Sequence, residues 1–367
     1  MNRQIITASL ISRPVRTLVS ILAVALEVTM ILVIVGLTTG ITNDNGKRIV
    51  GVGGDLLLQA PNSSMILSFS SASMPVAIGQ KIAKEVPGVK AVTPVVLQTS
   101  SEGGVETIWG IDPQSFQAVG GPLVFQKGGL FGNSDEIVVD DIWAESNKAA
   151  IGQQVELLGQ KFKVAGIVEH GRGARVYASL PAMQEMMGAA NKAAIFFIKA
   201  NRPEDIESVK AGILAMLPEH KVTLSRDLMS LMSTDKIPGL DAFIRSVVFI
   251  AVCVGVLVIF LSMYTTITER TREIGILRSL GASKSFVVWL IFEESLVLCV
   301  LGVGVGWIGS KLIVALLHSI FPTLQILMTP EWIVRASIYA VLSGVIGSFY
   351  PSLKAAAQDP IEALAYE

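Results

Sequence analysis

Four long apolar segments constrain the fold of this chain more than any other feature of its sequence. They cover residues 17–41, 243–267, 286–317 and 331–350. A helix rises about 1.5 Å per residue, so about 20 residues suffice to cross roughly 30 Å of hydrocarbon. The chain is also 51% hydrophobic and only 16% charged, which is unusual for a soluble domain. The sequence therefore predicts an α-helical membrane protein with four transmembrane helices.

The distribution of arginine and lysine predicts how these segments are oriented. Residues 1–16 contain three arginines and no acid, and the loop at 268–285 contains four basic side chains, whereas the connection at 318–330 contains none. Basic residues accumulate on the cytoplasmic side of membranes. We therefore expect a cytoplasmic N-terminal segment (1–16), a cytoplasmic loop (268–285), an extracytoplasmic loop (318–330) and a cytoplasmic tail (351–367).

The block at 42–242 lies outside the predicted helices and is large enough for a domain with its own core. Its residue patterns indicate two β-α-β units at its ends and a mostly β region between them. The expected strands are Asp55–Gln59, Ala91–Gln98, Glu136–Val139, Gln154–Leu158, Lys161–Val168, Ala194–Lys199 and Lys221–Leu224, and the expected helices are Val76–Val86 and Pro203–Leu217. The predicted fold thus adds an α+β extracytoplasmic domain of two lobes, inserted between transmembrane helices 1 and 2.

A short charged segment, Glu269–Lys284, separates the second and third apolar segments. Its sequence, ERTREIGILRSLGASK, predicts a helix with an Arg270–Glu273 pair at i, i+3 spacing and a stop at Gly281. Ile274, Ile276, Leu277 and Leu280 fall on one side of that helix, and Arg272, Gly275 and Ser279 line the other. A helix this short cannot bury an apolar stripe by itself, so we expect those side chains to contact a partner.

Three stretches of the chain resemble one known family. ERTREIGILRSLGA (Glu269–Ala282), YPSLKAAAQDPIEALAYE (Tyr350–Glu367) and SRPVRTLVSILAVAL (Ser12–Leu26) are similar to the interspan loop, the C-terminal motif and the entry to the first span of MacB/FtsX-like ABC transporter permeases. The resemblance implies a stand-alone permease subunit in a bacterial inner (cytoplasmic) membrane. It also implies mechanotransmission, in which ATP hydrolysis on a separate ABC-type ATPase subunit moves the periplasmic domain and so exports or extracts a substrate.

The same resemblance makes the charged helix a coupling helix that docks on the ATPase. The docking set that it implies comprises Glu269, Arg270, Arg272, Glu273, Ile274, Leu277, Arg278 and Gly281. The other expected partners are a second permease subunit, in a homodimer or a heterodimer, membrane lipid and, in a tripartite efflux route, a periplasmic adaptor protein. Two alternatives stay open: a non-transport membrane sensor or scaffold with an extracytoplasmic binding domain, and an FtsX-like regulator of cell-wall hydrolases.

Three acids and two glycines are notable inside the apolar segments. Glu27 lies near the middle of the first segment, and Glu293 and Glu294 lie near the start of the third. An ionised carboxylate is costly in hydrocarbon, so each acid needs a partner or a proton. Pairing is favoured for Glu294, while Glu27 is left open between a helix–helix hydrogen bond and a substrate or proton path. Gly302 and Gly306 form a G-x-x-x-G pattern that favours close helix packing.

Several kinds of chemistry find no support in the sequence. The chain has no G-x-x-x-x-G-K-[ST] motif for ATP hydrolysis, its three histidines are far apart, and both cysteines lie in apolar segments. We therefore expect no catalytic residue, no metal and no cofactor in this subunit, with ATPase activity only in its partner. A net charge of −1 gives no basic surface for nucleic acid. The glycine-rich stretch Glu169–Arg175, EHGRGAR, is interpreted as a flexible connector.

Overall fold

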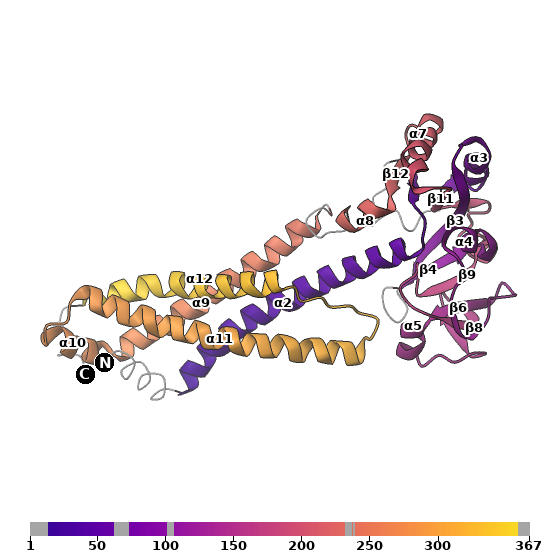
Figure 1. Cartoon of the computed structure of the whole chain (residues 1–367). Helices are drawn as coiled ribbons and strands as arrows, with labels where there is room; N and C mark the ends of the chain where they lie inside the picture. Colours follow the sequence, from indigo (N-terminus) through magenta and orange to yellow (C-terminus); the bar gives the residue numbers. More distant parts are fainter. Residues whose placement is uncertain (1–13, 62–72, 101–105, 232–236, 238, 359–367) are drawn as a thin grey trace. The chain divides into compact units, whose positions relative to one another are not determined.

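The computed structural model describes residues 14–61, 73–100, 106–231, 237 and 239–358. Within them, four helices are long and apolar enough to cross a membrane: α2 (Pro14–Gly51), α9 (Leu240–Glu269), α11 (Lys284–Ile320) and α12 (Pro330–Ala357) (Figure 1). The four predicted spans are therefore present. Residues 1–13 of the N-terminal segment and residues 359–367 of the C-terminal motif lie outside the described part of the chain.

The chain divides into two compact units. One unit takes the described parts of residues 1–40, 237–320 and 326–367, and the other takes those of residues 41–236 together with residues 321–325. Helix α2 belongs to both units, because it continues past its apolar run for a further ten residues that include Asp44 and Arg48. The short connection between α11 and α12 also contributes its middle residues to the second unit.

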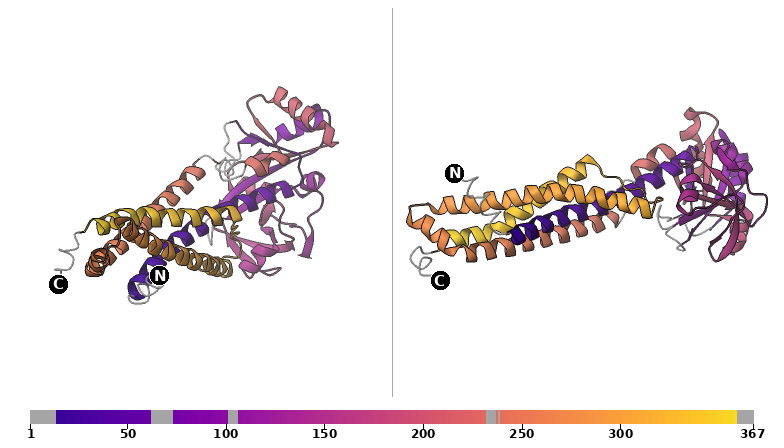
Figure 2. Two further views of the ribbon diagram at one scale, coloured as in Figure 1. Left: turned by 60° about the vertical axis from the view of Figure 1, so that its left-hand side comes forward. Right: turned by 90° about the horizontal axis from the view of Figure 1, so that it is seen from below.

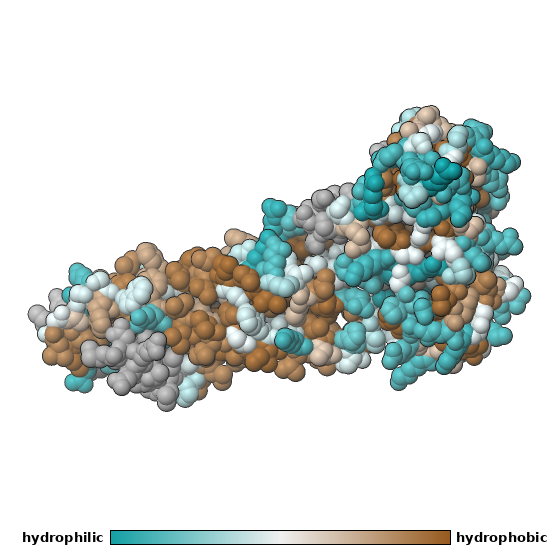
Figure 3. All heavy atoms as spheres, in the orientation of Figure 1, coloured by the Kyte–Doolittle hydropathy of each residue, from teal (hydrophilic) through white to brown (hydrophobic). Residues whose placement is uncertain are grey.

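The first unit is a bundle of the four long helices with a small-residue core. Helix α12 packs along both α9 and α11, as the two views of Figure 2 show. Glycines allow the closest approach: a Cβ at Gly302 of α11 would lie 2.5 Å from the Cβ of Val24 on α2, and one at Gly306 would lie 2.8 Å from the Cβ of Val28. Large apolar side chains also point outward, as the brown surface of the helices in Figure 3 shows. A lipid-facing bundle has this surface.

The second unit is built on one ten-stranded sheet. Its strand order is β12-β1-β11-β3-β4-β9-β6-β8-β5, with β7 paired to β8. The strands are β1 (Leu56–Gln59), β3 (Val89–Ser100), β4 (Glu106–Ile111), β5 (Phe125–Gly128), β6 (Glu136–Asp140), β7 (Gln154–Leu157), β8 (Gln160–Val168), β9 (Val176–Ser179), β11 (Ile195–Ala200) and β12 (Lys221–Leu224). A separate two-stranded ribbon joins β2 (Met74–Pro75) to β10 (Lys192–Ala193).

Alternating side chains of the sheet bury two different helix layers. Leu56 and Leu58 of β1 pack with α3 (Ala77–Glu85) and α7 (Ile206–Met216), the latter preceded by the 3₁₀ turn η2 (Pro203–Asp205). Leu57, between them, points to the opposite face. There it joins a core that includes side chains of α4 (Pro113–Gly120), α8 (Ser225–Leu231) and the end of α2. Helices α5 (Asp141–Ser146) and α6 (Leu180–Met186) cover the far half of the sheet.

The predicted strands and helices of this domain are all present, with ends that differ by at most two or three residues. The two terminal β-α-β units interlock, because β1 pairs with both β11 and β12. The sequence patterns did not predict β4, β5 and β9 of the sheet, the ribbon strands β2 and β10, or the three short helices α4, α5 and α6. The missed strands matter for the architecture: the pairs β3–β4 and β4–β9 join the two predicted lobes into one continuous sheet.

Candidate functional site

The charged segment between α9 and α11 folds as the predicted short helix, α10 (Thr271–Ser279). Arg270 separates it from α9 with a non-helical backbone at φ −111°. Gly281 follows its end at φ +99°, a conformation that costs glycine little and other residues more. Gly275, within the helix, is buried. The turn chemistry therefore fixes where α10 begins and ends.

The junction between α9 and α10 is tied to two other spans by ion pairs. Glu269 accepts a hydrogen bond from Arg16 of α2 at 3.2 Å. Arg270 pairs with Glu273 of α10 at 2.7 Å, as its spacing predicted, and with Glu294 of α11 at 3.5 Å. The Glu294 side chain is only 6% exposed, so this contact provides the counter-ion that a buried carboxylate needs.

Both ends of α10 contact α12 or the residue that follows it. The Arg278 guanidinium donates to the backbone carbonyl of Ala356 in the last turn of that helix. Gln358, just beyond it, donates to the Thr271 hydroxyl at 3.4 Å. Helix α10 and its N-cap Arg270 thus contact α11 and α12 directly, and α2 is paired with the last residue of α9, just before α10.

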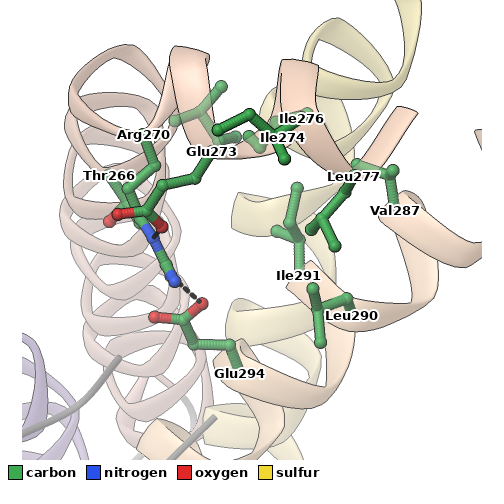
Figure 4. A pocket seen from close by; sticks show the side chains of 11 residues that line it. Thr266, Arg270, Glu273, Ile274, Ile276, Leu277, Val287, Leu290, Ile291 and Glu294 are labelled. Atoms are coloured by element: carbon green, nitrogen blue, oxygen red, sulfur yellow. Dashed lines mark hydrogen bonds and ion pairs between the residues drawn. The ribbon is translucent and has the colours of Figure 1, made fainter. Parts of the chain in front are cut away.

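A pocket of about 320 Å³ lies between α10 and the adjoining ends of α9 and α11 (Figure 4). Ile274 and Leu277 of α10 face it, opposite Val287, Leu290 and Ile291 of α11. The Arg270–Glu294 pair forms its polar wall. The two apolar side chains expected to meet an external partner therefore line this pocket and are partly buried.

The outer surface of α10 carries a different set of residues. Leu280, just after the helix, is 80% exposed and Ile276 is 43% exposed, although Ile276 also touches the pocket rim. Arg272 is exposed as well. Ile276 and Leu280, which the helical wheel placed on the same side as Ile274 and Leu277, are more exposed than those two side chains.

The two remaining intramembrane acids differ in environment. Glu293 is on the surface of α11 and accepts a hydrogen bond from Trp289 Nε1 at 2.8 Å. Glu27 is buried in the bundle beside Ser343 of α12. Neither lies with the pocket residues, so the three acids form no common site in the described part of the chain.

The second unit contains a buried ionic cluster that the sequence patterns did not predict. Arg175, whose side chain is 8% exposed, pairs with Asp140 and with Asp44, each at 3.2 Å. The same guanidinium donates to the carbonyl oxygen of Thr323, in the connection between α11 and α12, at 3.1 Å. Arg48 of α2 pairs with Asp44 at 3.1 Å. Burial raises the pKa of Asp140, against the opposing effects of Arg175 and of the Trp143 backbone N–H.

The loop Glu169–Arg175 is an ordered part of this cluster, so its interpretation as a flexible connector was wrong. Arg172 donates to the carbonyl oxygens of Gly120, Gly121 and Pro122 at the end of α4. The Tyr177 hydroxyl donates back to the carbonyl of Arg172. Glycines here permit close backbone packing, and the arginines supply the bonds that fix the loop.

Comparison with known proteins relates this architecture to a family. Residues 17–216 match the MacB-like periplasmic core domain, and residues 245–360 match the FtsX-like permease C-terminal domain. The first match alone covers more than half of the chain. The chain belongs to the MacB/FtsX-like ABC transporter permeases. It is a multi-pass membrane protein with four candidate spans, and as an ABC permease it implies an ATPase partner.

Individual relatives place this permease further within the family. It is 24% identical to the uncharacterized ABC transporter permease YknZ of Bacillus subtilis, over 100% of this chain and 99% of that one. It is also 24% identical to the uncharacterized ABC transporter permease YvrN of the same organism, with 98% of each chain covered. The macrolide export ATP-binding/permease protein MacB of Hahella chejuensis is 29% identical over 59% of this permease, but only 35% of that longer protein is matched.

The extracellular domain of YknZ has been solved and matches 46% of this permease at 19% identity, with a TM-score of 0.37. The periplasmic region of MacB from Actinobacillus actinomycetemcomitans matches 50% at 14% identity, with a TM-score of 0.39.

Proposed function

We propose that this permease couples ATP hydrolysis on a separate ATPase subunit to movement of its α+β domain, and that this movement exports or extracts a substrate from the outer face of the inner membrane. The observation that carries the proposal is the set of contacts around α10: Arg16–Glu269 joins α2 to the end of α9, Arg270–Glu294 joins the start of α10 to α11, and Arg278–Ala356 joins α10 to α12. A helix connected in this way can transmit a movement of the ATPase to the whole bundle.

Three chain crossings would carry that movement into the α+β domain. Helix α2 runs without a break from one unit into the other. The chain re-enters the first unit at Ile237, and residues 321–325 of the α11–α12 connection belong to the second unit. Arg175 fastens this connection to Asp44 of α2 through its bond to Thr323. In this mechanism, α2 and the segment leading into α9 connect the two units through the backbone, and the Arg175 hydrogen bond joins the α11–α12 connection to α2.

The ATPase would dock on the outer surface of α10. Leu280 and Ile276 supply exposed apolar contacts, and Arg272 supplies a charge at the rim, where charged pairs chiefly set orientation. Ile274 and Leu277 would move toward α11 and fill the pocket behind α10. Helix α10 would then shift without losing buried contacts. A second permease subunit, and where export is tripartite a periplasmic adaptor, would complete the assembly.

Copurification tests the proposal against a sensor or scaffold. Tagged permease taken from its native membrane in a mild detergent should bring an ABC-type ATPase with it, and the pair should hydrolyse ATP. A permease that purifies without any ATPase under conditions that keep other ABC complexes intact would favour the sensor or scaffold.

The orientation has its own test. We propose that both termini and α10 are cytoplasmic and that the α+β domain is extracytoplasmic. Basic residues are concentrated in residues 1–16 and in the loop at 268–285, and four spans return the C-terminus to the side of the N-terminus. An impermeant thiol reagent added to intact cells should label a cysteine at Ser134, in the α+β domain, and should miss one at Ser283, beside α10. Labelling of the cysteine at Ser283 in intact cells would contradict this topology.

A further inference from the structure

Glu27 occupies a closed position among the four helices of the bundle. Its side chain is 2% exposed. One carboxyl oxygen, Oε1, lies 2.8 Å from the Ser343 hydroxyl on α12. The other, Oε2, faces Gly255 of α9 so closely that a Cβ at that position would overlap it. On α11, the Cys299 thiol is the titratable group that interacts with the carboxyl.

The hydrogen bonds around Ser343 require one more proton than the serine can supply. Its Oγ lies 2.8 Å from Glu27 Oε1 and 3.0 Å from the carbonyl oxygen of Tyr339, one turn earlier in α12. A hydroxyl has a single proton, which can serve only one of these two acceptors. If the carboxyl carries a proton on Oε1, both contacts are satisfied: Glu27 donates to Ser343, and Ser343 donates to Tyr339.

The second carboxyl oxygen also indicates that Glu27 carries a proton. Oε2 is buried and has no hydrogen-bond partner among the residues that the structure describes. An ionised carboxylate shares its charge between both oxygens and would need donors or a cation at each of them. Glu294, on the next helix, shows the contrast, because Arg270 supplies a counter-ion to it. Glu27 is surrounded by a hydroxyl, a thiol and a glycine instead.

We infer that Glu27 is a proton-binding site of the membrane helices, occupied while α2, α9 and α12 are packed as they are here. The bound proton bridges α2 to α12 and lets Gly255 lie against a neutral oxygen. A conformation that moved α9 or α12 away would admit water or a cation and release the proton. Low pH therefore favours the packed arrangement and high pH the separated one. The inference stands whether or not the chain exports a substrate.

Infrared spectroscopy of the full-length permease in lipid tests this occupancy. At neutral pH, the difference spectrum between the native chain and Glu27→Gln should contain the carbonyl stretching band of a protonated carboxylic acid. Gln is close in shape and uncharged, so it is the least disruptive replacement. Glu294→Gln is the matched control and should remove only carboxylate bands, because Glu294 is paired with Arg270. Carboxylate bands in the Glu27 difference spectrum would overturn the inference.

Ser343→Ala provides a second test that leaves Glu27 in place. A protonated Glu27 would lose its hydrogen-bond acceptor, so its carbonyl band should persist and shift in frequency. An unchanged band would show that the proton is not on the oxygen facing Ser343, and would contradict the proposed arrangement.

Discussion

Leu280→Asp should release the ATPase from the permease while leaving the membrane helices folded. Leu280 is 80% exposed at the end of α10, so the change removes an available apolar contact and introduces a charge without disturbing the bundle. Truncating a central apolar contact costs about 2 kcal/mol or more in binding, which corresponds to a roughly 30-fold weaker Kd, and a buried charge costs more. Copurification of the ATPase and binding of the purified subunits measure the effect.

Ser283→Asp is the matched control for that variant. It places the same charge three residues away, on an exposed position whose side chain already caps the start of α11 by accepting from the Phe286 N–H. Aspartate can keep this cap. Normal docking of Ser283→Asp with loss in Leu280→Asp would locate the contact. Normal docking in both variants would place the ATPase elsewhere, with the pocket residues Ile274 and Leu277 the next candidates.

Arg175→Met should destabilise the α+β domain by about 3–5 kcal/mol, because it leaves buried Asp140 without its cation. Denaturant midpoints of the full-length protein, followed by tryptophan fluorescence, measure the loss. Arg226→Met is the control: its pair with Glu207 is largely exposed, so that substitution should cost under about 1 kcal/mol.

The Arg175 effect should also depend on pH in a defined direction. Burial already raises the pKa of Asp140, and removal of Arg175 takes away an interaction that lowers it. A raised folded-state pKa contributes stability that is present below the ordinary value, about 4, and is lost as the pH rises through the folded-state value. The deficit of Arg175→Met should therefore be largest near neutrality and shrink in acid. A deficit independent of pH would mean that Asp140 is not the group left unpaired.

Much of the fold could be predicted because its determinants are local. Apolar length predicted all four spans, and alternation predicted seven strands of the sheet. The end of α2 was missed because polar residues such as Asp44 and Arg48 follow its apolar run, and hydropathy does not distinguish a polar helix from a loop. The strands β4 and β9 were missed because their identity depends on neighbours that are distant in sequence.

The functional groups were harder to predict because their partners are remote. Arg175 lies 131 residues from Asp44 and 148 from Thr323, so no local pattern connects them. Its loop contains two glycines and polar residues, which suggested mobility. The local pattern did predict the short helix α10, and the Arg270–Glu273 spacing was correct. Which of its side chains face inward depended on the packing of α11, which the sequence does not specify.

In the proposed mechanism, ATP hydrolysis moves the α+β domain through the helices that enter it. A flexible Gly-Ser insertion after Gly239, where the chain already has φ +85° before α9 begins, would break one of these links without altering a buried residue. Spin labels at Ser134 and Ser319, in a chain lacking Cys253 and Cys299, report movement between the α+β domain and α11. The permease is reconstituted with its ATPase for this measurement.

We predict that ATP shifts the distance between the two labels in the chain of native length. In the insertion variant, hydrolysis should continue while the shift is reduced or lost. An unchanged distance in the native-length chain during ATP hydrolysis, or an equal shift in the insertion variant, would contradict mechanical coupling through this junction.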